Sequence, residues 1–183
     1  MENLKRHTFA ILVANETGVL SQITRLFSRK GYNIESVACG TTTDPAISRI
    51  TIEIISDERQ AELLCNQLRK VLLVHSVKIL EPTQSIRREL VLIKVRAASR
   101  EIRNEVIQIA NIFRGSVIDV CAETITISLI GAEEKTEAVE TLLQEFGVEE
   151  LVRTGIIALE RGRYTIDENT KEKGEFDYGK NVL

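Results

Sequence analysis

NETGVLSQITRLFSRKGYNIES, residues 15–36, follows a run of strand character and decides the first unit of the fold. Its apolar residues recur at three- and four-residue spacing, which predicts a helix from Val19 to Lys30 packed on one side. Gly31 stands where a C-terminal cap is expected, because glycine adopts the left-handed conformation without strain. The sequence therefore predicts a strand that enters a helix through a turn at Gly18.

The sequence on either side extends this βα unit into a βαββαβ pattern. Residues 49–54 alternate between apolar and polar side chains, which predicts a strand with one face in the core and one in solvent. Asp57, three residues before Gln60, resembles a capping box, and it starts a helix whose buried stripe is predicted to reach Leu72. The predicted elements are strands at 7–15, 33–42, 49–54 and 74–80, and helices at 19–30 and 57–72.

The same order returns after a polar, proline-containing segment at 81–85, which is interpreted as a short linker. This second half is predicted to have strands at 89–97, 117–122, 124–130 and 148–159, and helices at 102–113 and 138–146. Two consecutive split βαβ units predict an α+β protein with two ferredoxin-like domains, each an antiparallel sheet with helices on one face. The predicted boundaries are 1–81 for the first domain, 82–162 for the second, and 163–183 for a polar, mobile tail.

Composition excludes several classes of function. The net charge is −3 with acids and bases interspersed, so there is no electrostatic footprint for nucleic acid or an anionic membrane. No apolar run approaches the roughly 20 residues that span a bilayer, and no signal-type core follows the N-terminus, so a cytoplasmic protein is expected. An RNA-binding module shares this topology, but the chain has three tyrosines, five phenylalanines and no tryptophan, too few to stack bases.

Catalytic groups are hard to assemble from this sequence. His7 and His75 each fall at a predicted strand edge, where a solvent-facing side chain is expected. Metal-ligand spacings of histidine, cysteine and carboxylates are missing, as are the phosphate-loop and dinucleotide glycine patterns. We therefore expect no catalytic residues, no metal site and no cofactor in this chain.

Binding is the better interpretation of the turn at Gly18. Free N–H groups in the first turn of a helix favour a carboxylate, and a glycine lets the backbone approach a ligand. Asn15 and Asn33 end the first strand and begin the second, so both amides could converge near Gly18, Val19 and Leu20 and hold an amino acid. Aliphatic contacts would come from Ile34, Leu12 or Val37. Alternatively, Gly18 is an ordinary turn glycine and the asparagines only form turns.

The first sheet also has a face that needs a partner. Leu12, with Ala10 and Ala14, would leave an apolar patch on the side away from the helices, and sizeable exposed patches are uncommon on monomers. Burial against another sheet, domain or subunit is expected, which favours at least a homodimer.

Several blocks of the sequence together match one known family in the right order: NETGVL (15–20), LFSRKGYNIES (26–36), DP and SRIT (44–45, 48–51), REL and LIKV (88–90, 92–95), IFRG and IDV (112–115, 118–120), and RTG and RG (153–155, 161–162). Through these blocks the sequence from Leu4 to Gly162 resembles the regulatory (small) subunits of acetolactate synthase, also called acetohydroxyacid synthase. Many members of this family have proline where Thr17 stands, which predicts a modest change in effector affinity.

The resemblance implies an N-terminal ACT domain, which binds amino acids at domain interfaces, and a second domain of related topology. It implies binding to the large catalytic subunit, activation of that subunit, and feedback inhibition by valine, or sometimes by leucine or isoleucine. Thiamine diphosphate, magnesium and FAD would belong to the large subunit. The implied valine site comprises Asn15, the backbone of Gly18, Val19 and Leu20, and Asn33 with Ile34 from the facing ACT domain of a dimer.

Two rival functions remain open. One is a stand-alone amino-acid-sensing ACT protein that controls a different enzyme or a transcription factor. The other is a small ferredoxin-like enzyme that turns over substrate without a partner.

Overall fold

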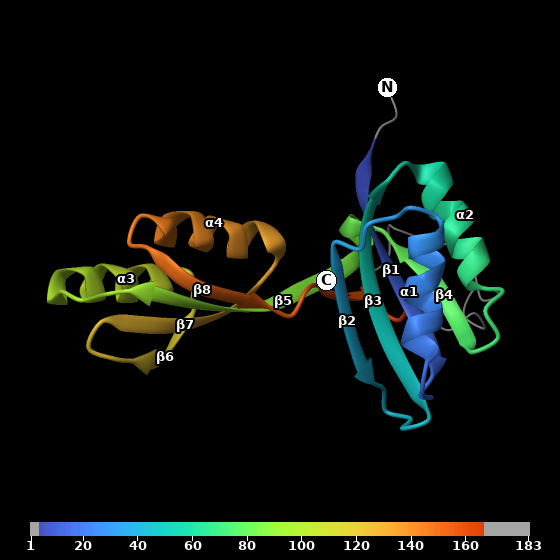
Figure 1. Ribbon diagram of the computed structural model, residues 1–183, viewed down its shortest axis with the longest axis horizontal. Coiled ribbons are helices and arrows are strands. Elements are labelled where there is room, and N and C mark those ends of the chain that lie inside the picture. Colours follow the sequence, from blue (N-terminus) through green and yellow to red (C-terminus); the bar gives the residue numbers. More distant parts are fainter. Residues whose placement is uncertain (1–3, 167–183) are drawn as a thin grey trace. The chain divides into compact units, whose positions relative to one another are not determined.

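The computed structural model describes residues 4–166, and the chain forms two compact units. Of the described residues, the first unit contains 4–86 and also 156–166, whereas the second contains 87–155. Each unit combines one sheet with two helices (Figure 1).

The first unit has a four-stranded antiparallel sheet in the order β2-β3-β1-β4, with both helices on one face (Figure 1). The long strands β1 and β3 pair over their whole length, from Lys5 opposite Ser56 to Ala14 opposite Ile47. Its elements are β1 (Lys5–Ala14), α1 (Val19–Arg29), β2 (Ser36–Thr41), β3 (Ile47–Ser56), α2 (Glu58–Leu68) and β4 (Val74–Leu80).

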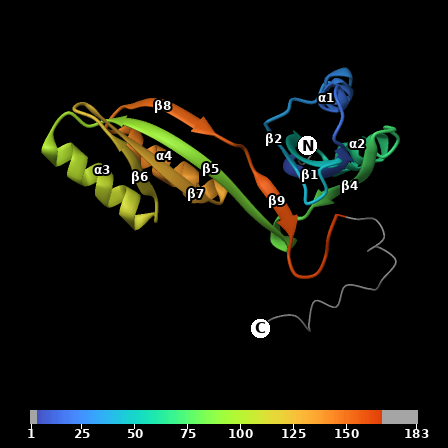
Figure 2. The ribbon, with the colours of Figure 1, turned by 90° about the horizontal axis from the view of Figure 1, so that it is seen from below.

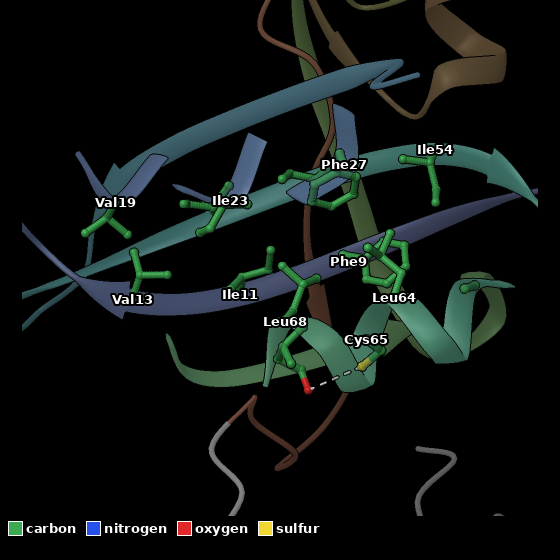
Figure 3. Close-up of a cluster of buried hydrophobic side chains, with 14 residues drawn as sticks. Phe9, Ile11, Val13, Val19, Ile23, Phe27, Ile54, Leu64, Cys65 and Leu68 are labelled. Carbon is green, nitrogen blue, oxygen red and sulfur yellow. Dashed lines mark hydrogen bonds between the residues drawn. The ribbon is translucent and has the colours of Figure 1, made fainter. Parts of the chain in front are cut away.

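The core of the first unit lies between the sheet and its two helices (Figure 3). From α1, Val19, Ile23 and Phe27 are buried, at the four-residue spacing that the sequence predicted. The rings of Phe9 and Phe27 meet edge to face, with centroids 6.2 Å apart. Burying each such side chain contributes about 1.5–3 kcal/mol, so α1 is held mainly by its packing on the sheet.

The ends of α2 agree only in part with the prediction. Asp57 caps its N-terminus, because a carboxylate oxygen accepts a hydrogen bond of 2.8 Å from the backbone N–H of Gln60. The helix stops at Leu68, and Leu72 is 93% exposed instead of completing the buried stripe. The apolar spacing continues past the helix, but the chain has already turned toward β4.

The second unit repeats this arrangement with the strand order β6-β7-β5-β8. A 3-10 turn at Pro82–Gln84 takes the place of the predicted linker, and β5 starts directly after it. The predicted fold class is therefore confirmed, with two antiparallel βαββαβ arrangements. Its elements are β5 (Ser85–Arg96), α3 (Arg100–Ile112), β6 (Ser116–Val120), β7 (Thr124–Gly131), α4 (Glu133–Gln144) and β8 (Val148–Arg153).

A separate strand near the end of the chain was not predicted. The predicted strand at 148–159 is divided by Gly155, whose φ is 74°, into β8 and β9 (Ile157–Glu160). β9 pairs with β5 (Figure 2), and residues 156–166 belong to the first unit. The second unit accordingly ends at 155 and not at the predicted 162.

β9 covers the face of the first sheet that the helices leave open. Ile156 and Ala158 pack with Ala10 and Leu80, which point away from the helices. Thr51 and Glu53, predicted to face solvent on β3, are 3% and 0% exposed for the same reason. The sequence predicted burial of this face against another sheet, domain or subunit, and the chain's own strand β9 supplies part of that cover.

The start of the predicted tail also packs on the first unit. Ile166 is 8% exposed within this second cluster, and its carbonyl oxygen accepts a hydrogen bond from the hydroxyl of Ser76. Packing therefore extends to 166, beyond the predicted start of the tail at 163. The mobility predicted for the rest of the tail concerns 167–183, which lie outside the described residues.

Candidate functional site

The turn between β1 and α1 leaves a helix N-terminus open. Gly18 has φ 89° and ψ −9°, and no side chain caps the helix. Among the described residues, the N–H groups of Leu20 and Ser21 have no hydrogen-bond acceptor. A Cβ placed on Gly18 would meet no atom within 4 Å, so there is open space over the turn. The first turn of α1 itself carries no acidic side chain that would offset the partial positive charge of the helix N-terminus.

Asn15 is bonded to the loop between β2 and β3 and to the start of β3. Its amide nitrogen donates to the carbonyl oxygen of Pro45 at 2.9 Å, and its amide oxygen accepts from the hydroxyl of Ser48 at 3.1 Å. The backbone N–H of Asn15 donates to Ala46 at 2.7 Å. Asn15 thus holds that loop beside the end of β1.

Asn33 lies in the segment between α1 and the edge strand β2. Its amide nitrogen donates to the Glu35 carboxylate at 2.7 Å, which leaves its amide oxygen as an acceptor. On either side, Tyr32 and Ile34 are partly buried against the core. Burial raises the pKa of Tyr32, and the negative charge of Asp57 acts in the same direction. Asn33 therefore sits at the surface on an anchored segment.

Within the described residues of one chain, neither amide is hydrogen-bonded to the turn at Gly18. Asn15 is bonded to residues 45 and 48, and Asn33 is bonded to Glu35. Of the aliphatic residues expected to contact a ligand, Ile34 and Leu12 are partly buried and Val37 is 42% exposed. Sequence reasoning missed Ser48 and Glu35, although the register of β3 against β1 places Ser48 beside the end of β1.

The histidines do not face a common site. His7 was predicted to face solvent, but it is 6% exposed, and its Nε2 lies 3.1 Å from the carbonyl oxygen of Ser56. His75 is exposed, as predicted. Within residues 4–166, no three histidine, cysteine or carboxylate side chains gather as a metal site would require. No helix in this described part is both long and apolar enough to cross a membrane.

Two family models match the chain, one for each half. The model described as "AHAS small subunit-like ACT domain" matches residues 9–76, which span β1 to β4 of the first unit. The model described as "Small subunit of acetolactate synthase" matches residues 88–162. The Gly18 turn, Asn15 and Asn33 all lie within the first match.

Relatives resemble the chain over most of its length. The probable acetolactate synthase small subunit of Methanothermobacter thermautotrophicus is 41% identical over 160 residues, covering 87% of this chain and 95% of the relative. The acetolactate synthase small subunit of Aquifex aeolicus is 42% identical over 158 residues, covering 86% and 82%. The crystal structure of the acetolactate synthase small subunit from Thermotoga maritima superposes with a TM-score of 0.80 at 37% identity, covering 87% of this chain and 99% of that one.

Proposed function

The chain belongs to the acetolactate synthase small-subunit family, and from this premise we propose that it is a non-catalytic regulatory subunit that senses valine. It binds the catalytic large subunit, raises the activity of that subunit and makes the activity sensitive to valine. Membership of the family supports the proposal that the large subunit is the partner. The geometry of the first unit supports the proposed position of the valine site.

The observation that carries the effector site is the open N-terminus of α1. The carboxylate of an amino acid accepts hydrogen bonds from backbone N–H groups at such a position and is attracted by the helix dipole. Leu20 supplies one of these N–H groups, and Gly18 leaves space for the ligand. This geometry favours an amino acid bound by its carboxylate.

A second copy of the chain completes the site. β2 is an edge strand of the first sheet, and edge strands are ready to pair with another chain. A two-fold pairing of two first units would bring Asn33 and Ile34 of one copy toward Gly18 of the other. The free amide oxygen of Asn33 would accept from the ammonium group, and Ile34 would contact the aliphatic side chain.

The chemistry belongs to the partner in this proposal. The large subunit carries out the carboligation with thiamine diphosphate, magnesium and FAD, and both subunits work in the cytoplasm. Valine bound between two copies fixes one geometry of the regulatory dimer. A coupling of about 1–3 kcal/mol between the valine site and the catalytic subunit is enough for marked inhibition.

Reconstitution with the large subunit of the same organism tests this function. Acetolactate formation is measured for this chain alone, for the large subunit alone, for the mixture, and for the mixture with valine. We expect no activity from this chain alone, a rise on mixing, and a valine-dependent fall in the mixture only. A mixture that is no more active than the large subunit, and no more sensitive to valine, would contradict the proposal.

A further inference from the structure

Residues 156–160, which we call the strap, cross the helix-free face of the first sheet and are bonded to three of its strands. The backbone N–H of Ile156 donates to the hydroxyl of Ser36 on β2 at 3.1 Å. The guanidinium of Arg49 on β3 donates to the carbonyl oxygen of Ala158 at 2.7 Å. The ammonium of Lys78 on β4 lies 2.5 Å from the carboxylate of Glu160.

Two of these bonds start beside the proposed effector site. Ser36 is two residues after Ile34, at the start of the edge strand. Arg49 directly follows Ser48, whose hydroxyl donates to the amide oxygen of Asn15. The segment that carries Asn33 and the strand that is bonded to Asn15 therefore also carry polar groups that hold the strap.

Glu160 is the charged anchor at the far edge of the sheet. Its side chain is 11% exposed and that of Lys78 is 31% exposed, so their ion pair is partly shielded from solvent. Burial lowers the pKa of Arg49, whereas the negative charge of Glu160 acts in the opposite direction. The carboxylate of Glu160 therefore offsets the positive charges of two partly buried side chains, Lys78 and Arg49. If Glu160 lost its charge, both cations would lose a nearby opposite charge.

We propose that the strap and the valine site are coupled, such that bound valine tightens the strap and a weakened strap lowers the affinity for valine. This inference rests on the proposed function. A ligand that immobilises Asn33 and Ile34 also immobilises Ser36, the acceptor for the first N–H group of the strap. Coupling between two sites is reciprocal, so both effects have the same magnitude.

The strap is also joined along the chain to the second unit, so a change in the strap can act on that unit. Its first residue follows directly after the second unit, which ends at Gly155. The second unit is thus joined through its C-terminal end to an element whose bonds lie beside the effector site. Glu160, Lys78 and Arg49 act here as positioning residues for the strap and do not contact the ligand.

Hydrogen exchange on the full-length wild type tests the first half of the proposal. Exchange of the Ile156 amide is measured with and without saturating valine, and binding is verified by calorimetry. We expect the amide to exchange about fivefold more slowly, or slower still, with valine bound. Unchanged exchange in a protein that binds valine would overturn the coupling and leave the proposed function standing. If the wild type does not bind valine, the proposed function fails and the coupling fails with it.

Calorimetric titration of a variant tests the second half. Glu160→Gln removes the charge of the anchor at nearly constant size, and we expect it to bind valine about fivefold more weakly. Glu160→Asp keeps the charge that acts on both Lys78 and Arg49, so it should bind valine more tightly than Glu160→Gln, which mere loss of packing would not explain. Glu150→Gln is the matched control, since it breaks a Lys94–Glu150 pair of 2.9 Å in the second unit. Wild-type affinity in Glu160→Gln, with faster exchange at Ile156, would also overturn the coupling.

Discussion

The guanidinium of Arg49 donates a hydrogen bond of 2.7 Å to the carbonyl oxygen of Ala158, a residue that lies 109 positions later in the chain. This bond joins β3 to the strap on the face opposite the helices. Because residues 87–155 form their own unit, they interrupt the sequence of the first unit. The first unit is therefore built from both ends of the described chain.

Removal of this donor should destabilise the first unit. Arg49→Met keeps an unbranched side chain but leaves the Ala158 carbonyl oxygen without its donor, at a cost of about 1–3 kcal/mol. Chemical denaturation gives this free energy of unfolding. Arg59→Met, at an exposed position on α2, is the control and should unfold like the wild type. Equal stability of the two variants would contradict the role of Arg49.

Two neighbouring isoleucines of the strap should contribute very differently to the free energy of unfolding. Ile156 is 2% exposed and packs on the sheet, whereas Ile157 is 58% exposed. Ile156→Ala should lower the free energy of unfolding by about 2–4 kcal/mol, because it leaves a cavity in a buried cluster. Ile157→Ala should change it by less than about 0.5 kcal/mol. Denaturant midpoints check both values, and similar losses in both variants would mean that the strap does not cover the sheet.

Charge at position 18 should control effector binding. Asparagine and aspartate both tolerate the left-handed conformation of Gly18, and no neighbouring atom obstructs a Cβ there. They have nearly the same size, but aspartate places a negative charge where the valine carboxylate would bind. Calorimetry should show binding to Gly18→Asp about tenfold weaker than to Gly18→Asn, or weaker still. If both variants bound valine equally, the valine carboxylate would not bind at the first turn of α1.

The titration of Tyr32 should report the burial of the segment that carries Asn33. The fold raises the pKa of Tyr32 above its ordinary value of 10.0, mainly by burial, so the neutral phenol is favoured. The unfolded chain titrates first as the pH rises, and the stability that Tyr32 contributes falls above pH 10.0. The absorbance difference between wild type and Tyr32→Phe should show a midpoint of tyrosinate formation above this value. A midpoint at or below it would contradict the burial of Tyr32.

Local patterns were enough to predict most elements of both units. The buried stripe of α1 consists of Val19, Ile23 and Phe27. It was predictable because residues four positions apart lie on the same face of a helix. The Asp57 cap was predictable because its partner is Gln60, three residues away. Leu72 shows the limit of this reasoning, since apolar spacing does not say where a helix stops.

Long-range partners were not predictable in the same way. Glu53 stands in an alternating strand and was expected to face solvent, but a short strand from the end of the chain covers its side of the sheet. Nothing within Ile157–Glu160 indicates which sheet this strand joins. Asn15 was correctly placed at the end of β1, yet its bond to Ser48 depends on the pairing of β1 with β3.

A crystal structure with valine tests the central claim most directly. We predict two copies paired through their first units, with ligand density between the first turn of α1 at Gly18 in one copy and Asn33 of the partner subunit. The valine carboxylate should accept hydrogen bonds from backbone N–H groups of that turn. Valine density at any other place, or first units that do not face each other across the ligand, would contradict this account.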